Sequence, residues 1–248
     1  MSAESLADPE SSTDGAASDP TCQPHEHHLT TTRAARYFVL GTPSPLVREC
    51  WVVLHGYGQL AARFIRNFTA AISPQRLFVA PEALSRFYVS SDVTAHAQSR
   101  VGASWMTRED RLAEINDHVG FLDTVWTRVA DGLDSANVKL GVLGFSQGAA
   151  TASRWTALGV SPVRRLVLWG GAVPDDLPLD TLRDRLSGET LALVMGDHDR
   201  FSSAARLTAQ LERLRGHRIP TTLSTFVGGH RMDAAALARV LADFESGS

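Results

Sequence analysis

The chain has 248 residues, and 44% of them are hydrophobic, which is enough apolar material for one large domain with a substantial core. Its formal net charge of -3 provides no strongly basic surface, so nucleic acid is not an expected partner. With two cysteines and no apolar run long enough to cross a bilayer, we expect free thiols, a cytoplasmic location and no stable membrane insertion.

The first 28 residues differ in composition from the rest. They are rich in Ser, Asp, Ala and Pro, and they carry six acidic residues and no Lys or Arg. Such a segment cannot bury enough apolar surface to offset the entropy of ordering, so we predict a disordered acidic tail over 1–28 and one domain over 29–248. The histidines at 25, 27 and 28 lie on this tail without a fixed geometry, and we expect no metal or organic cofactor.

The first half of the domain begins with apolar runs at 36–40, 50–54 and 77–80, which predict strands, and with helical spacing over 60–72. The run at 50–54 is apolar at every position, as in a strand covered on both faces. It ends in His55-Gly56-Tyr57-Gly58, a loop whose glycines let the backbone approach a ligand and whose Tyr57 N–H could donate to an oxyanion. We interpret His55 as a structural hydrogen-bonding residue.

A long segment follows at 82–106, with a polar middle and aromatic ends. Loops of this length in a compact domain are usually functional, so we expect it to form the acyl or alcohol pocket. The predicted pocket residues are Phe87, Tyr88, Trp105 and Met106. Trp105 could equally belong to the core.

Thr107 and Asp110 resemble a capping box before a long helix with apolar residues from 112 to 129. The next stretch, VKLGVLGFSQGAA at 138–150, predicts a strand, a sharp turn and a helix. In a Gly-x-Ser-x-Gly turn the serine is held at a strained backbone angle with its hydroxyl exposed. Ser146 is therefore the candidate nucleophile, and the N–H of Gln147 a second oxyanion donor; alternatively, Ser146 merely caps the helix.

The remaining elements alternate in the same way. We predict strands at 165–169, 191–195 and 222–227, and helices at 149–158, 201–214 and 233–244. Strands that alternate with helices over the whole body predict an α/β fold, with a mostly parallel central sheet and helices on both faces.

A serine hydroxyl is a weak nucleophile at neutral pH, so Ser146 needs a base and a carboxylate that orients the base. His230, just after the last strand and two glycines, is the natural base. Asp197 and Asp199 both follow the preceding strand, and spacing alone does not decide between them. We expect His198 and His217 to have no catalytic role.

Four motifs together resemble the phospholipase/carboxylesterase family of α/β-hydrolases, which includes the acyl-protein thioesterases. They are LHGYG at 54–58, GFSQG at 144–148, GDHD at 196–199 and GH at 229–230. The resemblance implies an α/β-hydrolase fold from about residue 33 onward, with Asp199 as the acid and the N–H groups of Tyr57 and Gln147 as oxyanion donors. The segments 81–88 and 102–111 resemble a bacterial esterase subgroup.

The sequence therefore predicts a serine carboxylesterase that hydrolyses small-molecule esters through an acyl-enzyme, with the triad Ser146, Asp199 and His230. An acyl-protein or carrier thioesterase, or a lysophospholipase, is the alternative within the same chemistry. A non-catalytic binding module on the same fold is the alternative of another class. The sequence does not set the acyl chain length or the oligomeric state.

Overall fold

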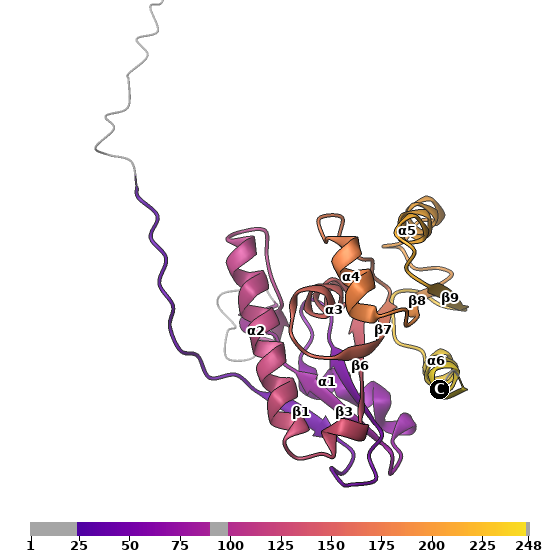
Figure 1. Cartoon of the computed structure of the whole chain (residues 1–248). Helices are drawn as coiled ribbons and strands as arrows, with labels where there is room; N and C mark the ends of the chain where they lie inside the picture. The colour runs from indigo at the N-terminus through magenta and orange to yellow at the C-terminus, as the bar shows by residue number, and fades with distance from the viewer. Residues whose placement is uncertain (1–23, 90–98, 247–248) are drawn as a thin grey trace, which may run out of the picture. The chain divides into compact units, whose positions relative to one another are not determined.

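The computed structural model of the chain describes residues 24–89 and 99–246 (Figure 1). Residues 35–248 form one compact unit, and residues 24–34, which belong to the other unit, contain no helix or strand. Most of the predicted tail, with Cys22, lies outside the described residues. Cys50 is a free and buried thiol, and burial raises its pKa to about 12.

A seven-stranded sheet forms the centre of the unit, in the order β1-β3-β2-β6-β7-β8-β9. Its strands are β1 (Tyr37–Leu40), β2 (Glu49–Leu54), β3 (Arg76–Pro81), β6 (Lys139–Phe145), β7 (Val163–Trp169), β8 (Leu191–Gly196) and β9 (Thr221–Phe226). β1 is antiparallel to β3, and the other neighbours are parallel. The inner strands are buried at nearly every position, so the prediction of a mostly parallel sheet covered on both faces is confirmed.

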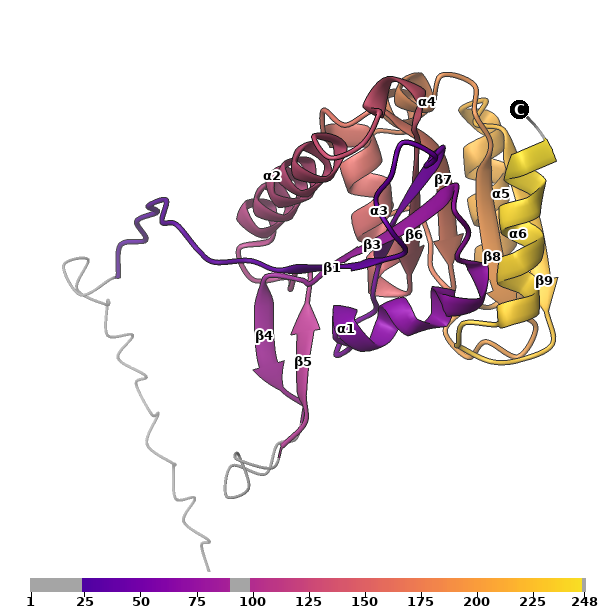
Figure 2. The same cartoon turned by 90° about the horizontal axis from the view of Figure 1, so that it is seen from below.

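The helices cover both faces of the sheet (Figures 1 and 2). They are α1 (Ala61–Phe64) with the 3-10 helix η2 (Ile65–Ala71), α2 (Arg111–Ala130), α3 (Gln147–Leu158), α4 (Leu179–Leu186), α5 (Ala204–Gly216) and α6 (Ala234–Ser246). α2, α3, α4 and α5 contribute to one apolar core, whereas α1, η2 and α6 contribute to the other. None of the described helices has the length and apolarity needed to cross a membrane.

The segment predicted as one helix over 60–72 is a single α turn followed by a 3-10 helix. Two of its polar side chains bond to backbone carbonyls three residues earlier, Asn67 Nδ2 to the Phe64 oxygen at 2.8 Å and Thr69 Oγ1 to the Arg66 oxygen at 2.9 Å. Such bonds compete with the regular helical ladder, which accounts for the tighter winding.

The segment 82–106 is not the continuous loop that the sequence suggested. Its described parts form a hairpin of two antiparallel strands, β4 (Ser85–Tyr88) and β5 (Val101–Ser104), in which Tyr88 pairs with Val101. Residues 90–98, between the strands, lie outside the described residues. Such short strands are difficult to predict from sequence when they are separated along the chain. Contacts across the strand pair stabilise them more than the backbone preference of their residues does.

The predicted capping box before α2 is also wrong. Asp110 occupies the N-cap position with a left-handed φ of 42°, and its side chain makes no capping bond. The Thr107 N–H instead donates to the Glu114 carboxylate, and Thr107 Oγ1 donates to the same group at 3.2 Å. The carboxylate therefore holds the segment that leads into the helix from within its first turn.

The strand order reverses between β2 and β6, which marks where a site can form. Strand β3, which follows β2 in the chain, lies on one side of β2 in the sheet. Strand β6 lies on the other side of β2, and β7 lies next to β6. In open parallel sheets, the loops at the carboxyl ends of two such strands separate and leave a crevice. The loops after β2 and β6 carry Tyr57 and Ser146.

Candidate active site

Ser146 lies in a tight turn between β6 and α3, with φ 55° and ψ -116°. Both flanking glycines are required by the packing: a Cβ on Gly144 would lie 2.1 Å from the Gly148 oxygen, and a Cβ on Gly148 would lie 2.2 Å from the Leu54 oxygen. A non-glycine residue at such angles stores about 1–3 kcal/mol of strain, which the packing must compensate. The Ser146 side chain makes no capping bond, so the alternative role of a helix cap is not realised.

An acid and a base meet beyond this turn. His230 Nδ1 lies 2.8 Å from Asp199 Oδ2, and the Asp199 side chain is only 1% exposed. The other carboxylate oxygen of Asp199 accepts a hydrogen bond from the Phe201 N–H at 2.9 Å. The His230 ring contacts the rings of Phe145 and Phe201, with centroids 4.8 and 4.7 Å away. The carboxylate thus fixes the imidazole through Nδ1 and leaves Nε2 able to accept a proton.

The two aspartates that spacing could not separate have different contacts. Asp197 Oδ1 accepts a hydrogen bond from the Gly228 N–H at 2.9 Å, so this residue holds the loop that carries His230. Asp199 contacts the imidazole itself. His198, between them, is mostly exposed. His217 bonds to Asp180 at 3.1 Å, away from this pair.

The turn after β7 contacts both Ser146 and His230. A Cβ on Gly170 would lie 3.1 Å from His230 Nδ1, and a Cβ on Gly171 would lie 2.7 Å from the Ser146 carbonyl oxygen. Consecutive residues of one short turn therefore touch the two groups. The side chains of Ser146 and His230 are not hydrogen-bonded to each other, and in free enzymes such bonds often tighten only when substrate binds.

The loop after β2 lies directly against Ser146. A Cβ on Gly56 would be 3.2 Å from the Ser146 Cβ, and the Gly56 N–H donates to Gln59 Oε1 at 2.8 Å. Among the described residues, the backbone N–H groups of Tyr57 and Gln147 have no hydrogen-bond partner. Gln147 is the first residue of α3, where the N–H groups carry partial positive charge. The two amides are therefore suited to stabilise a developing oxyanion.

His55 has the structural role that we predicted. It is fully buried, with Nδ1 2.8 Å from the Gly56 oxygen, and its Nε2 accepts the Ala83 N–H at 3.1 Å. These partners fix the neutral tautomer with the proton on Nδ1, because Nε2 must be free to accept. Burial lowers the pKa of His55 and favours the same neutral form.

The side chain of Gln147 has a role that the sequence did not reveal. Its Oε1 accepts the Trp105 N–H at 3.0 Å, and its Nε2 donates to the Met106 oxygen at 2.8 Å. The residue after the nucleophile is thereby bonded to the segment that follows β5. A polar side chain directly after a Gly-x-Ser turn is the signal that could have indicated it.

The four residues assigned to the pocket have different environments. Trp105 is only 3% exposed, and its indole N–H donates to the His55 oxygen at 2.8 Å, so it belongs to the core and is not proposed as a pocket residue. Met106 is half-buried beside Arg154. Phe87 packs on the ring of Tyr57 with centroids 5.0 Å apart, and Tyr88 is 50% exposed.

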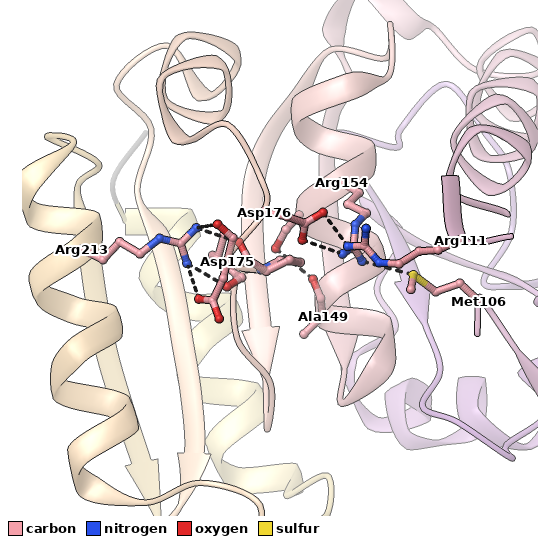
Figure 3. A network of polar contacts seen from close by, with 10 residues as sticks. Met106, Arg111, Ala149, Arg154, Asp175, Asp176 and Arg213 are labelled. Atoms are coloured by element: carbon pink, nitrogen blue, oxygen red, sulfur yellow. Dashed lines mark hydrogen bonds and ion pairs between the residues drawn. The ribbon is translucent and has the colours of Figure 1, made fainter. Parts of the chain in front are cut away.

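A polar network holds the segment between β7 and α4 (Figure 3). Arg154, almost fully buried on α3, donates to Asp176 Oδ1 at 3.1 Å, and Arg111 of α2 forms an ion pair with the same carboxylate. The hydrogen bond from Arg111 is the main cause of the lowered pKa of Asp176. Arg213 of α5 donates to the Pro174 oxygen at 2.7 Å. Helices on either side thus fasten the segment that follows the Gly170–Gly171 turn.

Within residues 24–89 and 99–246, no group of three His, Cys, Asp or Glu side chains is arranged to hold a metal ion. The chemistry that the site can perform with its own residues is nucleophilic. It combines a strained serine turn, a histidine oriented by a buried carboxylate, and two amides at the crevice.

The sheet order, the covering helices and the serine turn define an α/β hydrolase. The sequence profile of the serine hydrolase (FSH1) family matches residues 50–237, well over half of the chain. The chain belongs to this serine hydrolase family. Among curated protein sequences, none matches the chain significantly.

Solved structures with this fold include enzymes of the predicted group. A carboxylesterase from Mesorhizobium loti is 21% identical with a TM-score of 0.64, and the match covers 89% of this chain and 99% of that one. Acyl-protein thioesterase 2 from Zea mays is 19% identical with a TM-score of 0.63, over 86% and 99% of the two chains. A phospholipase/carboxylesterase from Dyadobacter fermentans is 16% identical with a TM-score of 0.60, over 85% and 96%. The α/β-hydrolase fold is confirmed.

Proposed function

We propose that the protein is a serine carboxylesterase in which Ser146, His230 and Asp199 form the catalytic triad. His230 Nε2 removes the hydroxyl proton as Ser146 Oγ attacks the ester carbonyl. The Tyr57 and Gln147 amides stabilise the oxyanion, and Asp199 stabilises the imidazolium. His230 then gives the proton to the departing alcohol, and water repeats the cycle on the acyl-enzyme to release the acid.

The observation that carries this proposal is the contact between His230 Nδ1 and the buried carboxylate of Asp199 at 2.8 Å, next to a serine with a positive φ. A buried carboxylate without a partner would be strongly destabilising, so its pairing with the histidine orients the imidazole at little further cost. Of two consecutive glycines, Gly170 lies against the imidazole and Gly171 lies against the nucleophile turn. The family to which the chain belongs supports the same chemistry.

The experiment is hydrolysis of 4-nitrophenyl acetate by the wild type and by Ser146→Ala. We expect the variant to lose about four to six powers of ten in kcat, because the nucleophile is gone, while its circular dichroism spectrum is unchanged. Labelling with a fluorophosphonate should modify the wild type at Ser146 and leave the variant unmodified. A variant that retained a comparable rate would exclude this mechanism, and a wild type that resisted the probe would favour a binding module.

Thioester hydrolysis uses the same residues, and one of the similar structures is named an acyl-protein thioesterase. A panel that pairs oxygen esters and thioesters of the same acyl group separates the two substrates, since both pass through the same acyl-enzyme. We expect higher kcat/KM for the oxygen esters. We also propose that residues 29–248 form the catalytic domain, that the segment 1–28 is dispensable for hydrolysis, and that the enzyme acts in the cytoplasm.

A further inference from the structure

A cavity of about 570 Å³ lies between the turn after β7 and helix α5, and Gly170 and Phe201 are part of its lining. Both of these residues contact His230: a Cβ on Gly170 would lie 3.1 Å from its Nδ1, and the ring of Phe201 packs edge-on against it. The cavity therefore adjoins the proposed catalytic base. The following inference about its ligand rests on the proposed function.

The lining of the cavity combines an apolar wall with three polar side chains of α5, those of Arg206, Gln210 and Arg213. Val173, Met195 and Leu207 provide apolar surface. Arg206 and Gln210 are four residues apart in the helix, so their side chains lie on the same face one turn from each other. A ligand that fits this lining has an apolar body and a polar group at the end near α5.

Two donors in this lining have no described protein acceptor, and of the two only the Gln210 amide is buried, whereas Arg206 is exposed. The amide nitrogen of Gln210 is buried and has no hydrogen-bond partner among the described residues. The guanidinium of Arg206 likewise has no described ion pair or hydrogen bond, although the residue's backbone N–H is bonded to Ser203 Oγ at 3.3 Å. A buried donor without an acceptor is unfavourable, and natural structures usually satisfy such groups. An acceptor on a bound ligand would satisfy the buried amide of Gln210, and the solvent-exposed guanidinium of Arg206 lies one helical turn away.

Arg213, the other cation in the lining, is already engaged. Its guanidinium donates to the carbonyl oxygens of Val173 and Pro174 and pairs with Asp175 at 3.2 Å (Figure 3). Its charge is therefore balanced within the protein. The positive charge left for a ligand is that of Arg206, which favours a single anionic group such as a carboxylate.

The position of the cavity indicates which half of an ester it would hold. The proposed oxyanion loop with Tyr57 follows β2, whereas the cavity lies beyond β7 and β8, on the side of Ser146 where His230 is placed. Because His230 must give its proton to the departing alcohol oxygen, the alcohol half lies on the histidine side. We propose that this cavity binds the alcohol portion of the substrate and selects alcohols or phenols that carry a carboxylate, which accepts hydrogen bonds from Arg206 and Gln210.

The test uses two acetate esters that differ only in the group at the far end, 3-acetoxyphenylacetate and its neutral amide, 3-acetoxyphenylacetamide. Both form the same acetyl-enzyme, so deacylation is identical and a difference in kcat/KM reports recognition of the alcohol portion. For the wild type we expect kcat/KM about tenfold higher for the carboxylate, the size of one charge-assisted hydrogen bond. Arg206→Gln should remove that preference and leave hydrolysis of the amide unchanged.

Two further variants make the assignment specific. Arg215→Gln removes an exposed cation of the same helix that does not line the cavity, and it should leave both rates unchanged. Gln210→Met keeps the side-chain volume and removes the amide donor, and it should lower kcat/KM for the carboxylate ester about threefold, less than the loss of the charged donor.

The outcomes are distinguishable. If the wild type hydrolyses both esters with equal kcat/KM, or if Arg206→Gln slows the neutral amide as much as the carboxylate, the assignment of the cavity is wrong and the esterase proposal stands. If the wild type hydrolyses neither ester, nor 4-nitrophenyl acetate, the esterase proposal itself is wrong. Retention of the preference in Arg206→Gln, whatever the effect of Arg215→Gln, would also overturn the assignment.

Discussion

The two ends of the central sheet use charged groups in opposite ways. At the amino ends of the strands, Glu49 bonds to Arg76 Nε at 2.9 Å through one oxygen and to Arg165 through the other. At the carboxyl ends, Asp199 orients His230, whose Nε2 has no hydrogen bond among the described residues. In the first arrangement both carboxylate oxygens have partners within the protein. In the second, one nitrogen of the imidazole has no described partner and is available for a substrate. The sheet is thus stabilised by charge pairs at one end and carries the proposed catalytic groups at the other.

The largest expected effect on kcat comes from substitution of the carboxylate that orients His230. Asp199→Asn should lower kcat by about ten thousandfold, because an amide in place of the carboxylate favours the wrong imidazole tautomer and no longer stabilises the imidazolium. Asp197→Asn is the matched control. Its oxygen still accepts the Gly228 N–H, and kcat should stay within about tenfold of the wild type.

Steady-state hydrolysis of 4-nitrophenyl acetate measures both variants, with thermal unfolding as a check on the fold. Equal losses in Asp197→Asn and Asp199→Asn would mean that the GDHD turn matters only as a structural unit. The claim that Asp199 at the carboxyl ends of the strands has a specific catalytic role would then be wrong.

Removal of the Glu49 ion pairs at the amino ends of the strands should lower stability and leave catalysis unchanged. Glu49→Gln removes the carboxylate that pairs with the guanidinium of Arg165, which is 5% exposed. Loss of one partner of a buried pair costs about 3–5 kcal/mol of unfolding free energy. Urea unfolding measures the loss, and kcat should be unchanged; a large fall in kcat at full stability would contradict the separation of the two ends.

The same variant gives a pH dependence with a defined sign. Burial alone would raise the pKa of Glu49, but hydrogen bonds from Arg76 and Arg165 outweigh it and hold the pKa below its ordinary value of 4.5. The stabilising effect of Glu49 is therefore fully present above pH 4.5 and is lost as the pH falls through the lowered folded-state pKa. The difference in unfolding free energy between the wild type and Glu49→Gln should narrow in that acidic range.

A smaller effect concerns a buried histidine beside Trp105, a residue of the segment that follows β5. His118 of α2 is buried edge-on against Trp105, and its ring nitrogens make no hydrogen bond of standard geometry among the described residues. Burial lowers its pKa from 6.5 to about 4. Protonation therefore favours the unfolded chain between these two pH values, and stability falls as the pH decreases through that range.

The wild type should lose about 3 kcal/mol more unfolding free energy than His118→Phe between pH 7 and pH 4. Urea denaturation at a series of pH values measures this difference, and Phe preserves the aromatic contact with Trp105. Parallel curves for the two proteins would show that His118 is not desolvated in solution as it is in the structure.

Much of the fold could be predicted from sequence because the inner strands are continuous apolar runs, a local pattern. The placement of Ser146 and His230 after the ends of strands could be predicted for a related reason, since a glycine turn after a strand signals a specific backbone geometry. The choice between Asp197 and Asp199 could not, because it depends on which carboxylate reaches an imidazole carried by the next strand. Resemblance to a known family favoured Asp199, and the observed contact with His230 agrees with it.

The features that sequence reasoning missed depend on contacts between distant segments. The β4 and β5 strands become visible only when they pair, and the side-chain bonds of Gln147 depend on where that hairpin ends. The α4 helix, by contrast, has apolar residues at 179, 182 and 186, a helical spacing that was present in the sequence and was not recognised. The cavity beside α5 involves two loops and a helix and has no local signature.

The double attachment of Gln147 has a consequence for turnover. In the proposed mechanism its backbone N–H donates to the oxyanion, and its side chain is bonded to the segment that leaves the hairpin. We therefore expect a displacement of that hairpin to shift the amide to which we assign polarisation of the carbonyl. Seating of a substrate against the hairpin and activation of its carbonyl become thermodynamically linked, and a substrate too short to reach the hairpin forgoes part of the catalytic effect.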